Sequence, residues 1–116
     1  MTIRMALFGA ALIATAVTNA HASGFATYFA LVSAAGKVAT SSGVASASKV
    51  ATGSYLVTFS RSIKGCGFVA MIKGSSAGLA TANYDAGHQA NMTVNTFSPS
   101  GAAANLPFNV IVSCAP

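Results

Sequence analysis

The residues with the clearest potential for chemistry in this sequence are Asp85 and His88, which lie three positions apart. A carboxylate beside an imidazole can orient the ring as a general base, and the many serines of the chain offer hydroxyl nucleophiles. The segment Asp85-Ala86-Gly87-His88 is also polar and contains glycine, a composition typical of solvated turns. We therefore interpret the pair as turn residues, and we expect no catalytic residue, no cofactor and no enzymatic activity.

Other familiar sites lack the residues they need. The chain has one acidic residue, Asp85, and two histidines, one of which, His21, lies near the N-terminus. A glycosidase needs two carboxylates, and a ribonuclease needs a second acid–base group beside its histidine. Cys66 and Cys114 are far apart in the sequence and form no metal-ligand pattern with the one remaining histidine. We expect no bound metal.

The N-terminus has the pattern of a secretory signal peptide. Arg4 supplies the positive start, an apolar run follows, and Ala20-His21-Ala22 matches an A-x-A cleavage site. The run is shorter than the about 20 residues of a membrane span, so a retained anchor is the less favoured alternative. We expect removal of residues 1–22, with cleavage after Ala20 as the second choice. Residues 23–116 would then form a single secreted or periplasmic domain without membrane association.

Export would place Cys66 and Cys114, the only cysteines, in an oxidising compartment. We expect a disulfide between them; free thiols or a metal pair are the alternatives. The bond would close a loop of about 49 residues, for which the chain-entropy model gives about 4 kcal/mol of stabilisation. That is comparable to the whole stability of a small domain.

Charge is sparse and mostly positive in residues 23–116. Asp85 is the one acid, and the cations are scattered at Lys37, Lys49, Arg61, Lys64 and Lys73. A basic balance is compatible with a surface glycan or another polyanion, although solubility alone explains it more simply. No basic run interleaved with aromatic residues occurs, so no nucleic-acid partner is expected.

Hydrophobic and polar residues alternate over short stretches separated by turn residues, which is typical of β-strands. In the clearest stretch, Tyr55, Val57 and Phe59 share one face. The expected strands span residues 25–33, 44–50, 55–60, 66–73, 79–84, 90–97 and 106–114, with 37–41 as a candidate hairpin partner of the first. About seven short strands predict an all-β fold, an antiparallel β-sandwich or a compact barrel.

Side-chain parity predicts which residues face the core. Cys66 shares a face with Phe68, and Cys114 with Val112, so both sulfurs should point inward and join a middle strand to the last. Both faces of residues 66–73 are apolar, which predicts a central strand or a strand at an oligomer interface. The residues expected to stabilise the core are Tyr55, Val57, Phe59, Cys66, Phe68, Phe108, Val110, Val112 and Cys114.

Three stretches together resemble a known kind of module. They are Gly53-Ser54-Tyr55-Leu56-Val57-Thr58-Phe59, then Cys66-Gly67-Phe68, and the closing Phe108-Asn109-Val110-Ile111-Val112-Ser113-Cys114. The pattern resembles an uncharacterised bacterial secreted β-rich module and, more distantly, is similar to domains near the tips of phage tail fibres. The resemblance implies fold and export, and it implies no activity.

These observations leave three hypotheses. The first is a secreted, non-enzymatic structural or recognition module of the bacterial cell envelope, which would present loops or a strand edge from a rigid sandwich. The second is a carbohydrate- or polyanion-binding, adhesin-like domain, for which a homo-oligomer is an option, such as a trimer in the manner of tail-fibre tips. The third is a small hydrolase that uses His88 and Asp85.

Overall fold

The computed structural model describes residues 26–116, and the predicted signal peptide (residues 1–22) lies outside them. The described chain forms eight antiparallel strands. Their bounds are β1 Ala26–Val32, β2 Val38–Ser42, β3 Val44–Ala51, β4 Ser54–Phe59, β5 Gly67–Ile72, β6 Leu79–Tyr84, β7 Asn91–Phe97 and β8 Phe108–Cys114. The all-β prediction is confirmed. The candidate hairpin partner predicted at 37–41 corresponds to β2, which pairs with β1 and brings the number of strands from about seven to eight.

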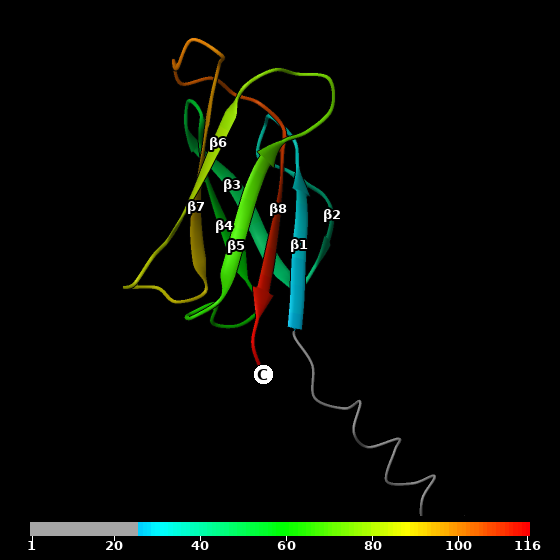
Figure 1. Cartoon of the computed structure of the whole chain (residues 1–116), viewed down its shortest axis with the longest axis vertical. Helices are drawn as coiled ribbons and strands as arrows, with labels where there is room; N and C mark the ends of the chain where they lie inside the picture. The colour runs from blue at the N-terminus through cyan, green and yellow to red at the C-terminus, as the bar shows by residue number, and fades with distance from the viewer. Residues whose placement is uncertain (1–25) are drawn as a thin grey trace, which may run out of the picture.

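Two four-stranded sheets face each other (Figure 1). Sheet A has the order β2-β1-β8-β5, and sheet B has the order β3-β4-β7-β6. Each sheet therefore has two edge strands, so the fold is a sandwich and not the closed barrel that the alternation also allowed. Gly43 links β2 to β3 at one corner, where its φ is +75° and a Cβ atom would overlap the Tyr28 ring. Only glycine fits this corner.

Alternation along the strands builds the core between the sheets. In β4, Tyr55, Val57 and Phe59 are buried while their neighbours are only partly covered. Strands β7 and β8 alternate in the same way, because successive side chains of a strand point to opposite faces. The buried hydrophobic residues are Ala30, Val32, Tyr55, Val57, Phe59, Ile63, Met92, Val94, Phe108, Val110, Val112 and Cys114.

At one end of the sandwich, hydrogen bonds join the β3–β4 turn and β7 to the loop before β8. Gly53, in the β3–β4 turn, donates its backbone N–H to Oδ1 of Asn105 at 2.8 Å, and its carbonyl accepts the N–H of Thr96 at 2.8 Å. The buried Thr96 hydroxyl donates to the carbonyl of Ala104. These bonds satisfy polar groups that burial would otherwise leave unpaired.

Cys66 and Cys114 form the expected disulfide. Cys114 is buried at the end of β8, and Cys66 is partly buried directly before β5. Gly67 pairs with Ser113, so the bond joins two neighbouring strands of sheet A. A disulfide is compatible with an oxidising extracellular or periplasmic environment.

One prediction about this segment is wrong. Residues 66–73 do not form a central strand, because β5 pairs only with β8 and is an edge of sheet A. Its inward residue Phe68 packs against the core, whereas Val69 and Met71 point outward and are about half exposed. The apolar outer positions therefore do not indicate burial within this chain.

Removing the disulfide should destabilise the domain strongly. We expect Cys66→Ala combined with Cys114→Ala to lower the free energy of unfolding by about 2–5 kcal/mol, because the unfolded chain regains the entropy of the open loop. Urea denaturation of the oxidised protein and of the double variant measures the difference. Wild-type protein under reducing conditions is the control and should match the variant; equal midpoints for oxidised protein and variant would contradict the prediction.

Tyr55 gives the stability a pH dependence. Its ring lies 5.0 Å from that of Phe108, and its hydroxyl donates to the carbonyl of Ala34 at 2.8 Å. Burial raises the pKa of this phenol above its ordinary value of 10.0. Above about pH 10 the unfolded chain loses this proton while the folded chain keeps it.

The titration of Tyr55 should therefore leave the free energy of unfolding unchanged below about pH 10 and lower it above that pH. At neutral pH, Tyr55→Phe should lower the free energy of unfolding by about 0.5–1.5 kcal/mol, because the hydrogen bond is lost. Above about pH 10, the stability of this variant should fall less steeply with pH than that of the wild type. Urea midpoints measured from pH 7 to about pH 11 test this. Parallel curves for the two proteins would show that Tyr55 does not contribute.

Candidate functional site

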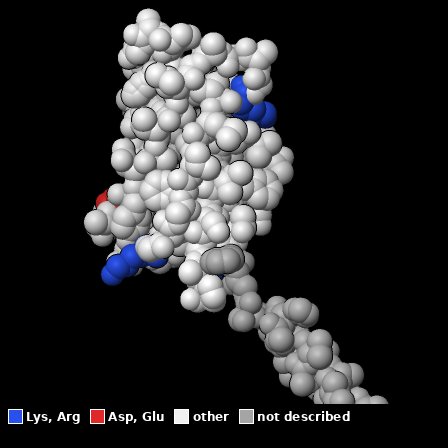
Figure 2. All heavy atoms as spheres, in the orientation of Figure 1, with Lys and Arg blue, Asp and Glu red and all other residues white. Residues whose placement is uncertain are grey.

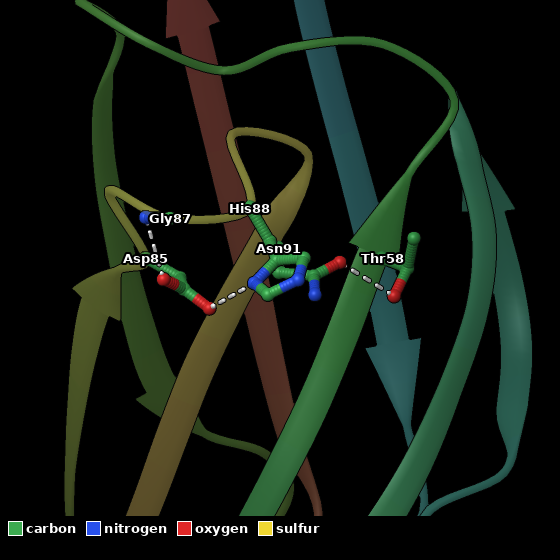
Figure 3. A network of polar contacts seen from close by, with 5 residues as sticks. All are labelled: Thr58, Asp85, Gly87, His88 and Asn91. Carbon is green, nitrogen blue, oxygen red and sulfur yellow. Dashed lines mark hydrogen bonds and ion pairs between the residues drawn. The ribbon is translucent and has the colours of Figure 1, made fainter.

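The Asp85–His88 turn joins β6 to β7 at the edge of sheet B (Figure 3). One carboxylate oxygen of Asp85 accepts the backbone N–H of Gly87 at 2.9 Å, and the other lies 3.3 Å from Nδ1 of His88. The His88 side chain is 76% exposed and that of Asp85 is 42% exposed. The two residues lie in a solvated turn, as the composition of the segment predicted, and within it their side chains are in contact.

The hydroxyl drawn in Figure 3, that of Thr58, is engaged elsewhere. Thr58, on β4, donates to Oδ1 of Asn91 on β7 at 3.0 Å. Among the hydrogen bonds of residues 26–116, none joins His88 to this hydroxyl or to any serine. The carbonyl of His88 instead accepts the N–H of Asn91 at 2.8 Å. The backbone contacts of the turn therefore lead directly into Asn91, where β7 begins.

Residues 26–116 have no pocket and no group of three or more His, Cys, Asp or Glu side chains that could hold a metal ion. This part of the chain also contains no helix that could cross a membrane.

Most side chains on the outer face of sheet B are uncharged and polar, and the face also carries Leu56 and, at one end, the hydrophobic pair Leu79 and Phe97. It is the most extended polar feature of the described residues. In strand register, Thr58 pairs with Asn91, Leu56 with Thr93, and Ser54 with Asn95. On either side of this pair of strands, Ser46 and Ser48 of β3 and Thr81 and Asn83 of β6 continue the same surface. We call this the polar face; its residues are Ser46, Ser48, Ser54, Leu56, Thr58, Thr81, Asn83, Asn91, Thr93 and Asn95.

The polar face was not predicted as a site. Alternation along each strand shows that the residues between the buried ones are Asn, Thr and Ser, so the signal was present in the sequence. What alternation does not show is that β4, β7 and β6 lie side by side.

The three tyrosines do not contribute to this face, whereas Phe97 of β7 lies on it, partly buried and opposite Leu79. Tyr55 is buried, and Tyr84 packs partly buried against the core. Tyr28 is covered on one side by Arg61, whose guanidinium lies 5.9 Å from the ring centroid, at a distance that allows cation–π attraction. The tyrosine rings therefore lie in the interior and at one corner of the sandwich, whereas Phe29 and Phe97 lie on the outer sides of sheets A and B.

Comparison with known proteins adds no further constraint, because no family model, curated protein or solved structure matches the chain.

The two polar pairs of Figure 3 should differ in their effect on stability. Thr58→Val removes the hydroxyl that donates to Oδ1 of the partly buried Asn91 side chain, and we expect the free energy of unfolding to fall by about 1 kcal/mol. His88→Ala removes an exposed imidazole–carboxylate contact, and we expect a change in the free energy of unfolding within about 0.5 kcal/mol. Urea denaturation of both variants tests the ranking; a larger loss for His88→Ala would show that the Asp85–His88 contact holds the turn.

Proposed function

We propose that the chain is an exported, non-enzymatic recognition module of the bacterial cell envelope, and that it binds an uncharged glycan through the polar face of sheet B. The observation that carries the proposal is the neutral hydroxyl and amide surface spread over adjacent hydrogen-bonded strands.

The chemistry of the polar face fits the hydroxyl groups of a sugar. Each Asn amide and each Thr or Ser hydroxyl offers both a donor and an acceptor. Asn83, Thr93 and Asn95 lie in adjoining rows on β6 and β7, so several such groups project from one rigid surface. Side chains held by a sheet lose little further freedom on binding, which favours affinity.

The pattern of residues 1–22 and the disulfide support export. The signal-peptide pattern directs a chain to an oxidising compartment, and the Cys66–Cys114 bond is stable in such a compartment. The resemblance to an uncharacterised bacterial secreted module points the same way.

A second candidate function is the binding of a polyanion. It is favoured by the charge of residues 23–116, in which five Lys and Arg residues stand against Asp85 alone. Attraction to a polyanion of this kind weakens as salt screens the charges, whereas hydrogen bonding to a neutral sugar does not depend on salt in this way.

A glycan array that contains neutral and acidic glycans, probed at about 50 mM and about 500 mM salt, tests the proposal. We expect binding of neutral glycans that changes little with salt. Thr93→Arg, which puts a long charged side chain in the centre of the polar face, should weaken binding at least about tenfold, because it blocks the surface.

The matched control is Ser76→Arg, which adds the same side chain to an exposed position in the β5–β6 loop and should bind as the wild type does. Neutral-glycan binding that survives Thr93→Arg would contradict the proposed site. Binding of acidic glycans alone, lost at high salt, would support the polyanion instead.

A further inference from the structure

The polar face of sheet B ends beside two hydrophobic residues, Leu79 of β6 and Phe97 of β7. They are partners in strand register, and their side chains lie on the same outer side as Thr81 and Asn95, the next outward pair along these strands. Leu79 is 58% exposed, and Phe97 is partly buried. We call Leu79 and Phe97 the hydrophobic pair.

Backbone contacts hold the hydrophobic pair in place. Gly78 directly precedes Leu79 and lies so close to β7 that a Cβ atom there would overlap the carbonyl of Phe97. On the side opposite to Leu79, the backbone of Phe97 pairs with Ala103. Since Ala103 carries only a methyl group, Phe97 has no large cross-strand neighbour on that side.

The hydrophobic pair and the polar residues beside it match the two kinds of surface of a pyranose ring. Hydroxyl groups project around the edge of such a ring, and C–H groups cover its two faces. A C–H face is attracted to the negative face of an aromatic ring, and the contact removes apolar area from water. Thr81 and Asn95 lie about 7 Å from the pair along the strands, within reach of the hydroxyl groups of the same sugar.

The shape of this surface suits a chain of sugars better than a single one. Residues 26–116 contain no pocket, so the surface cannot enclose a monosaccharide. The seven residues of β7 span about 20 Å, and every second side chain faces outward. Several sugars of an extended chain can therefore touch the strip at once, and their weak contacts add together.

No charged residue belongs to the polar face or to the hydrophobic pair. Asp85, the one acid of the chain, follows the end of β6 that is far from Leu79. The loop that joins β5 to β6 lies at the top of Figure 1, and Figure 2 shows no acidic side chain at that end and cations there only to the right. Contact with the pair therefore depends on the shape and hydrophobicity of the ligand.

We propose that the hydrophobic pair is the stacking subsite of the glycan site, and that it selects an extended, neutral chain of β-linked pyranoses whose ring substituents are all equatorial. This inference rests on the proposed glycan-binding function. Both faces of such a sugar carry only C–H groups, so the ring lies flat on Phe97 and Leu79. An axial hydroxyl would instead lose its water against side chains that offer no hydrogen bond.

Calorimetric titration of the purified protein with cellohexaose and with β-1,4-mannohexaose tests the proposal, because these neutral chains differ only in the orientation of the 2-hydroxyl, which is axial in mannose. We expect the wild type to bind cellohexaose at least about tenfold more tightly. Phe97→Leu, which removes the ring but keeps a hydrophobic side chain, and Leu79→Asn should each weaken cellohexaose binding at least about fivefold. Phe97→Tyr keeps the ring and should keep the preference for cellohexaose.

The matched control is Met71→Asn, at a 50% exposed residue of the edge strand β5 in sheet A, which should bind as the wild type does. Thermal melting shows whether each variant is folded, and Leu79→Asn changes a residue that is more than half exposed. Equal affinity for the two hexaoses would overturn the stacking subsite.

The failure of the subsite and the failure of the glycan function give different results. Cellohexaose binding that Thr93→Arg abolishes but Phe97→Leu and Leu79→Asn leave unchanged would overturn the subsite and keep the polar face as the glycan site. A wild type that binds neither hexaose nor any neutral glycan of the array would contradict the proposed function itself, and the subsite with it.

Discussion

The register of β5 against β8 is the constraint on which both surfaces of sheet A depend. Successive side chains of a strand point to opposite faces, so a slip of one residue exchanges the inner and outer sets. Such a slip would bring Val69 and Met71 into the core and expose Phe68. The Cys66–Cys114 bond lies directly beside the Gly67–Ser113 pair and therefore holds the strands in the observed register.

The same two-layer scaffold carries two different outer surfaces. Sheet B presents hydroxyl and amide groups, and sheet A presents hydrophobic side chains around one amide. Because the buried rows of both sheets are similar, stability does not require this difference between their outer rows. The proposed binding of a glycan by the outer face of sheet B gives the difference a functional reason.

The sequence alone predicted where most of the strands lie, but it did not predict which strands lie side by side in each sheet. Alternation in Tyr55–Phe59 and Phe108–Cys114 identified buried residues, because a half-buried strand imposes a period of two. The alternation did not show whether β5 is an edge strand or a central strand, because apolar side chains on both faces of a strand are compatible with both positions. The composition of the segment from Asp85 to His88 predicted a solvated turn, because that signal is local in the sequence. The polar face instead depends on long-range pairing of β4, β7 and β6.

The order and register of the strands of sheet A are the central claim, and cross-strand nuclear Overhauser effects in the oxidised protein test them most directly. Ile111 should show backbone contacts to Phe29 on one side and to Val69 on the other. Backbone contacts of Ile111 to Phe68 in place of Val69, or to any strand of sheet B, would contradict the account.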